Sequence, residues 1–557
     1  MNTTRAENTM IYEPMHMHLH TCHQPGGSME GHIYNASKLG MRYIRFTDHD
    51  TRTGRKQNPI ERFDFTKGVT MIHDRKKGTH GFETFGDAAI SFEDGKMIIK
   101  ASSDSEEYHR SGVYFTSSGT KHTVSLIAEV ALTLGLKFKT VGDARVYLDI
   151  RLSQRPPDHK PAHLIYCFDD CKSGQSLHTV RLPIKKSEDG MYRLSISDDI
   201  RSLWEIGGLD NVFDTLLITV EARKGGYAEL SLDRFEISAK YGYDDVIVRQ
   251  RAVADEIGKR YGVKPFVTTE ISDAGQHKNV FSTAVPVIDY EKRDYSVSEW
   301  EAVRHVKAHG GIFAYNHPFE NNKYKKLRDL TSQDVEQAVI NEAASLISTR
   351  LYGATLIEVG FTEGRGYFGL KEYLRLWDIL SLAGIFITGY GDSDSHYNDR
   401  SWFDGNNFAS WIAVDKSLSF PVPEEELIRS MKAGDVYMGD PVFLKSEISF
   451  TSGKARMGSV IFAGDEKPKM TFSVKAPIPL STVRVIVDGK VYIEEKIKSA
   501  DDYILNFEFS PEFATSFTRV EMYNPDGRCI MLTNPIYVVD REVFLGDIPE
   551  ERLVKEF

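Results

Sequence analysis

Three histidines near the start of the chain occupy alternate positions in the segment Glu13-Pro-Met-His-Met-His-Leu-His-Thr21. Successive side chains of a β-strand point to opposite faces, so His16, His18 and His20 would share one face of a strand. Imidazoles at this spacing can hold a metal ion through their neutral ring nitrogens. One histidine would suggest only a solvated strand face, but three in register, followed by further His and Asp motifs, favour a metal site.

Further polar groups follow other apolar segments of the chain. They are Asp48 and His49, Glu270, His317, and Asp394 and His396, with His277 in the loop after Glu270. Taken alone, each has an ordinary structural explanation such as a helix cap or a turn. Their common position at the ends of expected strands is stronger evidence, because carboxylates and histidines gathered there need a bound cation. A mixture of His and carboxylate suits Zn²⁺, Mn²⁺ or Fe²⁺ and does not suit Ca²⁺, which prefers oxygen ligands.

Alternating helix and strand patterns are expected to place these groups at one edge of a sheet. Residues 29–39 predict a helix with Gly40 as its C-cap, and residues 41–50 predict the next strand. The alternation resumes near residue 244 with a helix over 246–261 and continues to about residue 440. It argues for a parallel α/β barrel or sheet, in which chemistry collects at the carboxyl ends of the strands.

Two other stretches have β character. Residues 76–240 contain short alternating segments separated by Gly, Asp and Ser, which is typical of a β-sandwich. The segment GGYAELSLDRFEIS in this stretch resembles the last strands of jelly-roll carbohydrate-binding modules, which serve as spacers or bind sugars. Residues 441–557 predict a second β-sandwich with a hairpin turn at Asp488-Gly489, and they contain no cluster of catalytic residue types.

Composition limits the class of protein. The chain has 557 residues, of which 41% are hydrophobic and 11% aromatic, enough for several ordinary globular cores. The net charge of −11 argues against nucleic-acid and membrane-surface partners. The four cysteines show no zinc-ribbon spacing and no evident disulfide framework. Because the N-terminus has no apolar signal region and no apolar run approaches about 20 residues, we expect a cytoplasmic location.

Five ordered segments, HMHLHT, FTDHD, TTEIS, GIFAYNHP and GYGDSDSH, resemble the motifs of the PHP (polymerase and histidinol phosphatase) superfamily of metal-dependent hydrolases. The likeness covers roughly residues 10–55 and 241–440, and LTNPIYV near the end adds weaker support for the multidomain CehA/McbA-like branch. It implies an α/β fold with a distorted (β/α)7 TIM-like barrel and metal ions at the carboxyl ends of the strands. We therefore expect the barrel in residues 1–75 and 241–440, an inserted jelly-roll sandwich in 76–240 and a C-terminal sandwich in 441–557.

The same resemblance implies the ligand set. It assigns His18, His20 and Asp394 to a first metal ion, Glu270 to a bridge between two ions, His277 and His317 to a second ion, and His49 and His396 to a third. His16 stands where the family usually has Asp and would be a supporting residue. The loop Cys22-His-Gln-Pro-Gly26 lacks the family's third-site ligand, for which His23 and Glu30 are candidates, so two ions remain an alternative to three.

The chemistry expected at such a site is attack by an activated water. Ions bridged by Glu270 would lower the pKa of that water, with Asp394 as proton acceptor, or His396 if the third ion is absent. The residues expected to meet the substrate are Arg52, Arg365, Arg400 and Asn316, the last of which could instead support its turn. The leading hypothesis is a phosphoesterase acting on a small phosphorylated or sugar-linked substrate. The alternatives are hydrolysis of a carboxyl ester, carbamate or amide, and a carbohydrate-binding protein with a non-catalytic metal site.

Overall fold

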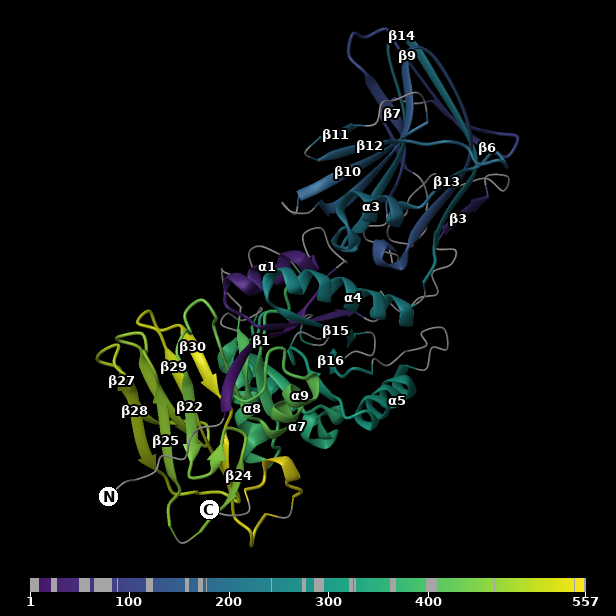
Figure 1. Ribbon diagram of the computed structural model, residues 1–557. Coiled ribbons are helices and arrows are strands. Elements are labelled where there is room, and N and C mark those ends of the chain that lie inside the picture. Colours follow the sequence, from purple (N-terminus) through teal and green to yellow (C-terminus); the bar gives the residue numbers. More distant parts are fainter. Residues whose placement is uncertain are drawn as a thin grey trace.

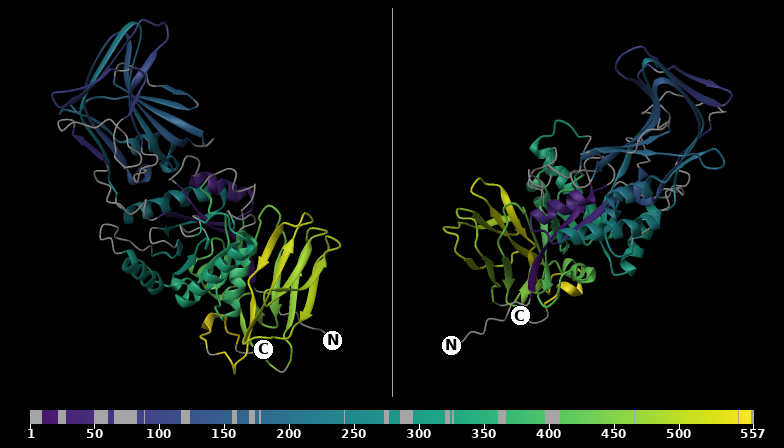
Figure 2. Two further views of the ribbon diagram at one scale, coloured as in Figure 1. Left: turned by 180° about the vertical axis from the view of Figure 1, so that it is seen from behind. Right: turned by 45° about the horizontal axis from the view of Figure 1, so that its top comes forward.

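The fold is seen in a computed structural model of the chain (Figure 1). It describes residues 10–21, 28–49, 61–64, 83–87, 89–116, 124–155, 160–168, 174–176, 178–241, 243–272, 277–284, 295–319, 324, 327–360, 367–396, 408–464, 466–544 and 546–554. A central region of helices and strands lies between a lobe of long strands, blue and teal, and a β region in green and yellow (Figures 1 and 2).

The central strands form one hydrogen-bonded path in the order β19-β18-β17-β16-β15-β2-β1-β20-β21. Their bounds are β1 Met10–Leu19, β2 Tyr43–His49, β15 Lys264–Ile271, β16 Lys278–Phe281, β17 Ile312–Tyr315, β18 Leu356–Gly360, β19 Thr388–Gly391, β20 Ala409–Asp415 and β21 Val436–Gly439. The pairs β1–β2, β2–β15, β17–β18 and β18–β19 are parallel. Strand β16 is antiparallel to both its neighbours, as is β20. The sheet is therefore mixed, not purely parallel.

The two ends of the barrel-like part of this path meet without a backbone ladder in the described ranges. After β19, Ser395 forms one parallel bridge with Leu19 of β1. The amide of Asn534 spans the gap between β19 and β21: Oδ1 accepts from Gly389 N, and Nδ2 donates to the carbonyls of Gly389 and Val436, each at 2.8 Å. A side-chain amide carries the same donor and acceptor as a peptide group, so it replaces strand pairing here. The sequence predicts a distorted (β/α)7 barrel; the described residues form a mixed sheet, and no closed barrel is seen among them.

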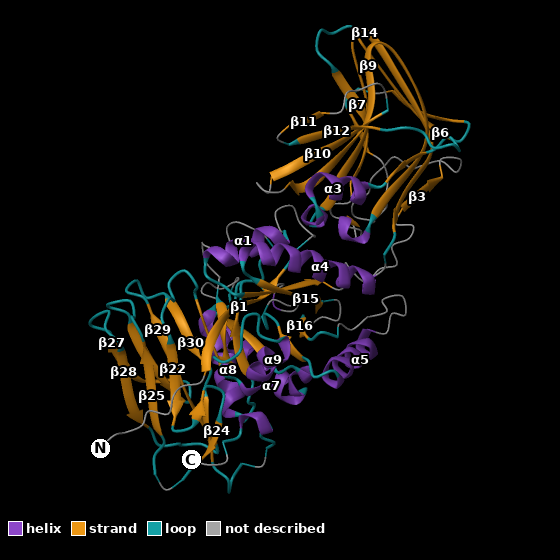
Figure 3. Cartoon of the chain, in the orientation of Figure 1, coloured by secondary structure: helices purple, strands orange, loops and turns teal. Residues whose placement is uncertain are grey.

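Helices surround the central strands (Figure 3). They are α1 Met29–Lys38, α4 Tyr243–Tyr261, α5 Tyr295–Ala308, α7 Ser332–Ser348, α8 Leu370–Leu382 and α9 Glu424–Ala433. The hydroxyl of Ser28 caps α1 by accepting a hydrogen bond from Gly31 N. The helices predicted over 29–39 and 246–261 are confirmed, and Gly262 follows the second with a φ of 68°, a conformation that favours glycine. Among the described residues, no helix has both the length and the apolar character needed to cross a membrane.

The strands from β3 to β14 form a second sheet, in the blue and teal lobe. Their bounds are β3 Glu61–Asp64, β4 Glu83–Phe85, β5 Ala89–Glu93, β6 Lys96–Ser103, β7 His109–Thr116, β8 Val124–Ser125, β9 Val130–Arg155, β10 Lys160–Cys167, β11 Gly174–Ser176, β12 Thr179–Pro183, β13 Tyr192–Leu194 and β14 Val212–Ala239, with helix α3 Ile196–Trp204 before β14. Where the sequence predicts several short strands, β9 and β14 run for 26 and 28 residues and pair with each other. Glycines with positive φ, Gly142 and Gly225, lie at a register shift and let both strands bend without leaving the ladder.

The C-terminal strands belong to two sheets. They are β22 Ile448–Ser452, β23 Ala455–Arg456, β24 Val460–Phe462, β25 Lys469–Val474, β26 Thr482–Val487, β27 Lys490–Lys496, β28 Tyr503–Glu508, β29 Thr515–Tyr523, β30 Cys529–Thr533 and β31 Ile536–Val539. The turn predicted at Asp488-Gly489 is confirmed, since it joins β26 to β27 with positive φ at both residues. Strands β22, β23, β25 and β28 form a four-stranded sheet. The other C-terminal sheet contains β24, β26, β27, β29, β30 and β31. Because β30 pairs with β21, this sheet continues the central one.

Candidate metal centre

Side chains from the carboxyl ends of several central strands converge on one region. They are His18 of β1 and His20 just beyond it, His49 of β2, Glu270 of β15, His277 before β16, His317 after β17, and Asp394 and His396 after β19. These residues lie as far as 378 positions apart in the sequence, from 18 to 396. The structure thus brings together these eight predicted ligands, because parallel neighbours present their carboxyl ends at one edge.

The first group has donor atoms at the separations of a metal site. The Nε2 atoms of His18 and His20 lie 3.1 Å apart, and Asp394 Oδ1 lies 3.2 Å and 2.9 Å from them respectively. The carboxylate of Glu270 faces the same point, 3.5 Å from His18 Nε2 and 3.7 Å from His20 Nε2. Ligand atoms about 2.1 Å from a tetrahedral ion lie about 3.4 Å apart, so this group matches such an arrangement.

Glu270 connects this group to the remaining histidines. Its Oε1 lies 3.0 Å from His277 Nδ1 and 3.4 Å from His317 Nε2. Its Oε2 lies 2.7 Å from His49 Nδ1. Because the two oxygens face different imidazoles, one carboxylate can serve two neighbouring ions.

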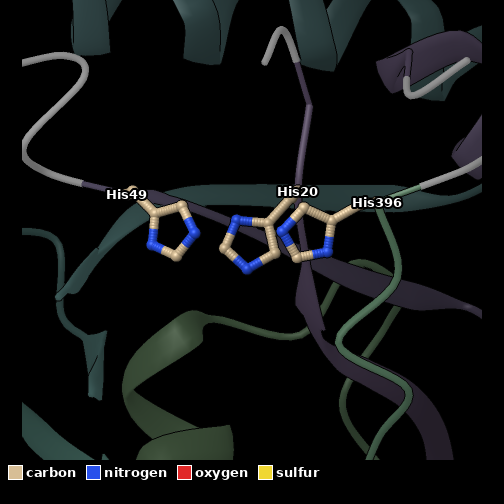
Figure 4. A group of neighbouring side chains, drawn as sticks. All are labelled: His20, His49 and His396. Carbon is tan, nitrogen blue, oxygen red and sulfur yellow. The ribbon is translucent and has the colours of Figure 1, made fainter. Parts of the chain in front are cut away.

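His20, His49 and His396 lie side by side in a row (Figure 4). The ring centroid of His20 is 4.5 Å from that of His49 and 4.1 Å from that of His396. His396 Nδ1 lies 2.9 Å from the carbonyl oxygen of Asp394, which leaves Nε2 as the nitrogen available to a ligand. Stacked imidazolium rings would repel one another, so this packing favours neutral rings that coordinate a cation.

Two carboxylates that sequence reasoning missed stand behind the predicted ligands. Glu358 of β18 and Asp392 after β19 lie 3.5 Å and 3.8 Å from His18 Nδ1. The other oxygen of Glu358 accepts a hydrogen bond from the backbone N–H of His317. Carboxylates in this position orient metal-bound imidazoles and raise their basicity. Asp392 ends the apolar segment IFITGYGD, so the strand-end rule that selected Glu270 and Asp394 could have found it. Glu358 lies inside the segment ATLIEVG, in the middle of β18, where that rule does not apply.

Asp48 and His16 hold the backbone around the site. Asp48 accepts hydrogen bonds from the Thr21 N–H at 2.5 Å, the Thr21 hydroxyl at 2.6 Å and Gln250 Nε2 at 2.8 Å. This fixes the segment after His20 to β2 and α4. His16 Nε2 lies 2.9 Å from the Ser393 hydroxyl, a contact that agrees with a supporting residue.

Asn316 is buried beside Glu270. Its Nδ2 donates to Glu270 Oε1 at 2.8 Å, and its Oδ1 accepts from the Tyr390 hydroxyl at 3.0 Å and from Asn279 N at 3.3 Å. Of the two roles considered for Asn316, these contacts favour support over contact with substrate. They hold the Glu270 carboxylate in one orientation.

Two predicted ligands have a backbone conformation that is unusual for a residue with a side chain. Asp394 has a φ of 47° and His317 a φ of 24°. Such conformations cost about 1–3 kcal/mol and persist where the surroundings enforce them, which occurs most often at functional sites. The Asp394 N–H donates to Asp392 Oδ1 at 3.2 Å, a local contact that helps to hold this turn.

The electrostatics of the centre favour a bound cation. Burial lowers the pKa of His317, but the hydrogen bond to Glu270 and neighbouring carboxylates raise it to about 10. Burial raises the pKa of Asp394, but the charges of His18 and His20 outweigh this and hold it well below its usual range. The carboxylates are therefore ionised near neutral pH and compensated by positive charge.

The nitrogen and oxygen atoms of this centre fit a divalent metal ion, which would supply the positive charge in place of the protons on the histidines. Glu270 is fully buried, and within the described ranges its Oε2 makes no hydrogen bond, since the His49 Nδ1 atom 2.7 Å away lacks the geometry of a donor. A buried carboxylate oxygen without a donor is unfavourable by several kcal/mol unless a cation faces it. Imidazole nitrogens with carboxylate oxygens are a ligand set for Zn²⁺, Mn²⁺ or Fe²⁺.

Some predicted residues cannot be placed. Arg52, Arg365, Arg400 and His23 lie outside the described residues, as does the rest of the loop 22–26. Their expected contacts with substrate or a third ion stay predictions. Glu30, the other candidate for that ion, is buried and accepts a hydrogen bond from the Tyr261 hydroxyl at 2.9 Å.

Comparison with known proteins adds little to this geometry. No protein-family model and no curated protein matches the chain. Among solved structures, a two-domain protein containing a predicted PHP-like metal-dependent phosphoesterase from Bacteroides vulgatus is 15% identical, with a TM-score of 0.27, over 52% of this chain and 79% of that chain. The xyloglucanase domain of NopAA from Sinorhizobium fredii is 14% identical, with a TM-score of 0.21, over 33% of this chain and 100% of that chain. At these TM-scores neither likeness establishes a shared fold, so the site rests on its own residues.

Proposed function

We propose that the chain is a metal-dependent hydrolase of the PHP superfamily, in its CehA/McbA-like branch, that cleaves a phosphoester with an activated water. The observation that carries the proposal is Glu270, a buried carboxylate whose two oxygens face different histidines. Two-ion hydrolases need a group in this position between their ions. The barrel architecture and its division near residues 75, 240 and 440 belong to the same proposal.

Two or three divalent ions, Zn, Mn or Fe, are the proposed cofactors. His18, His20 and Asp394 would hold one ion, His277 and His317 a second, and His49 and His396 a third, with Glu270 between them. Bound there, such ions polarise an ester and lower the pKa of a nearby water. His23 is the proposed additional ligand of the third ion.

The chain's own groups would move the proton and position the substrate. Asp394 is ionised because its pKa is held well below the usual range, which also makes it a weak base. It would accept a proton only from a water whose own pKa is strongly lowered. If the third ion is absent, His396 is the alternative acceptor, since burial lowers its pKa and keeps the ring neutral. Arg52, Arg365 and Arg400 are the proposed partners of the phosphoryl oxygens of a small substrate.

The proposal is tested by metal analysis combined with hydrolysis assays. The purified protein should contain bound metal by mass spectrometry and should hydrolyse bis-p-nitrophenyl phosphate. Asp394→Ala should reduce that rate about a thousandfold, because it removes both a ligand and a proton acceptor. Asp189→Ala, at an exposed ion pair with Arg193, is the matched control and should leave the rate unchanged.

Two results would redirect or reject the proposal. Cleavage of p-nitrophenyl acetate without any cleavage of the phosphodiester would favour a carboxyl ester or carbamate hydrolase, which uses the same water. Full hydrolysis by Asp394→Ala in a protein that still carries metal would reject a catalytic role for this centre.

A further inference from the structure

A cleft of about 1190 Å³ lies between the start of β1 and the four-stranded C-terminal sheet. Its walls come from residues 10–12 and 14, the end of α1 and the residues after it, β20, β21, residues 444–447, β22, β23 and β25. A strand rises about 3.3 Å per residue, so Tyr12 in this cleft lies about 20 Å from His18 in the metal centre. The cleft is therefore a separate site, and the proposed hydrolase chemistry does not use it.

Aromatic rings form the inner wall of the cleft. Trp411 pairs with Pro14 on one side and with Tyr437 on the other, so these side chains form a row across three strands. The rings of Trp411 and Tyr437 are stacked, with centroids 5.3 Å apart and planes at 9°. Tyr12 lies against Tyr437 at 5.0 Å. Trp411 is 8% and Tyr437 2% exposed, so only a small part of each ring borders the cleft.

A hydrogen-bonded group fixes one edge of this wall. The Tyr12 hydroxyl donates to Asp435 Oδ1 at 2.6 Å and accepts from Arg456 Nη2 at 3.3 Å. Arg456 Nε also lies 2.7 Å from Asp435 Oδ2. The Asp435 charge is neutralised within this group, which holds the Tyr12 ring in place.

Positive charge surrounds the wall. Among the described residues that line the cleft, five are basic and one, Glu447, is acidic; the basic ones are Lys38, Lys445, Lys454, Arg456 and Lys475. Because the charge of Arg456 is balanced by Asp435, the excess over Glu447 comes from the lysines. Glu447 is already paired with Lys475. Over the whole chain acidic residues outnumber basic ones, 80 to 69, so the excess of cations here is a local feature. Such a patch concentrates anions.

We propose that this cleft binds a small organic anion with a planar apolar part. The planar part would lie on the aromatic wall, and the acidic group would accept charge-assisted hydrogen bonds from Lys445 and Lys454. A purely apolar ligand would not need the cations, and an inorganic anion would not use the rings.

The test uses 2-naphthalenesulfonate, which has a planar ring system and one sulfonate but no ester bond that the proposed hydrolase could cleave. Titration calorimetry on the full chain should show saturable binding at one site. The double variant Lys445→Glu, Lys454→Glu should bind about tenfold more weakly or worse, because two favourable charges become repulsive. The matched control Lys467→Glu, Lys498→Glu changes two exposed lysines outside the cleft and should bind as the parent does.

Tryptophan fluorescence locates the ligand. Binding of the naphthalene ring should quench part of the emission, and Trp411→Phe should remove that ligand-dependent part while keeping an aromatic wall. Binding should persist in EDTA, which separates this site from the metal centre. Equal weakening in both lysine double variants, equal quenching in Trp411→Phe, or loss of binding in EDTA would each overturn the proposal.

Discussion

At the scale of single residues, Glu358 shows how one buried carboxylate can position two ligands. One oxygen lies 3.5 Å from the His18 ring, and the other accepts the His317 N–H. It lies behind the donor atoms, so it is a positioning residue and not a ligand of the first group. Its contribution is to orient the imidazole and to hold the turn at His317.

Glu358→Gln should therefore weaken metal binding without abolishing it. We expect about a 10- to 100-fold loss of affinity, because the amide keeps the shape of the side chain but not its charge. Competition with a chromogenic chelator measures the affinity. The control is Glu342→Gln, a buried glutamate that accepts hydrogen bonds from the Tyr315 and Tyr324 hydroxyls away from the centre; equal losses in both variants would contradict the assignment.

The protonation of His317 predicts a pH dependence of the metal-free protein. Its pKa is raised from 6.5 to about 10 in the folded chain, so the folded state binds this proton more tightly than the unfolded state. The resulting stabilisation is present in full below pH 6.5 and is lost as the pH rises through 10. Urea unfolding of EDTA-treated protein across this window should show the loss, and His317→Gln should show a smaller one. If the free energy of unfolding fell equally with pH in both proteins, the pH dependence would not come from His317.

At the scale of elements, Asn534 shows how a loop residue completes the central sheet. It precedes β31 in the chain, yet its amide makes three hydrogen bonds to β19 and β21. The turn with Asp394 follows directly after β19. The position of that ligand therefore depends on a residue from the C-terminal part of the chain.

Asn534→Ala should destabilise the protein by about 3 kcal/mol, because it leaves buried backbone groups without partners. It should also weaken metal binding, since β19 loses its link to β21. Chemical denaturation and chelator competition measure the two effects. Asn506→Ala, which removes an exposed cross-strand contact with Thr471, should change neither by more than about 0.5 kcal/mol. If Asn534→Ala bound metal as tightly as the parent protein, the link between β19 and β21 would not be needed to position the metal centre.

At the scale of the whole molecule, the central and C-terminal parts behave as one unit. Strand β30 extends the central sheet through β21, and buried Arg519 of β29 pairs with Asp378 of α8 and with Glu521. The long-stranded lobe also contacts the central part, because Asp210 accepts hydrogen bonds from the N–H groups of Met29 and Glu30 at the start of α1. These contacts join sheet, helix and lobe.

Arg519→Met should lower the free energy of unfolding by about 3–5 kcal/mol, because the buried carboxylates of Asp378 and Glu521 lose the cation that pairs with them. The control is Arg484→Met on β26, whose partner Glu494 is exposed and which should cost at most about 1 kcal/mol. Both are measured by denaturant unfolding. A comparable cost in the two variants would show that burial of the Arg519 pair adds nothing.

Many of the candidate ligands were predictable because they lie in short sequence segments that can be recognised one at a time. His18, His20, Glu270, His317 and Asp394 follow apolar strand segments, and strands of an α/β sheet bring such positions to one edge. The α1 and α4 helices and the Asp488-Gly489 hairpin likewise depend on local periodicity and turn chemistry. The long strands β9 and β14 were not predictable from the sequence. Glycine usually indicates the end of a strand, but in this pair the glycines lie where both strands bend together and remain paired.

The sequence by itself determined which side chains are candidate ligands and on which strand ends they lie, since both are local properties. Only the tertiary structure decided that Glu270 stands between histidine groups, that Glu358 and Asp48 support the centre, and that Asn534 links β19 to β21. Each of these facts is a contact between residues far apart in the chain. Such contacts depend on how strands and turns pack in three dimensions, and no local pattern specifies that packing.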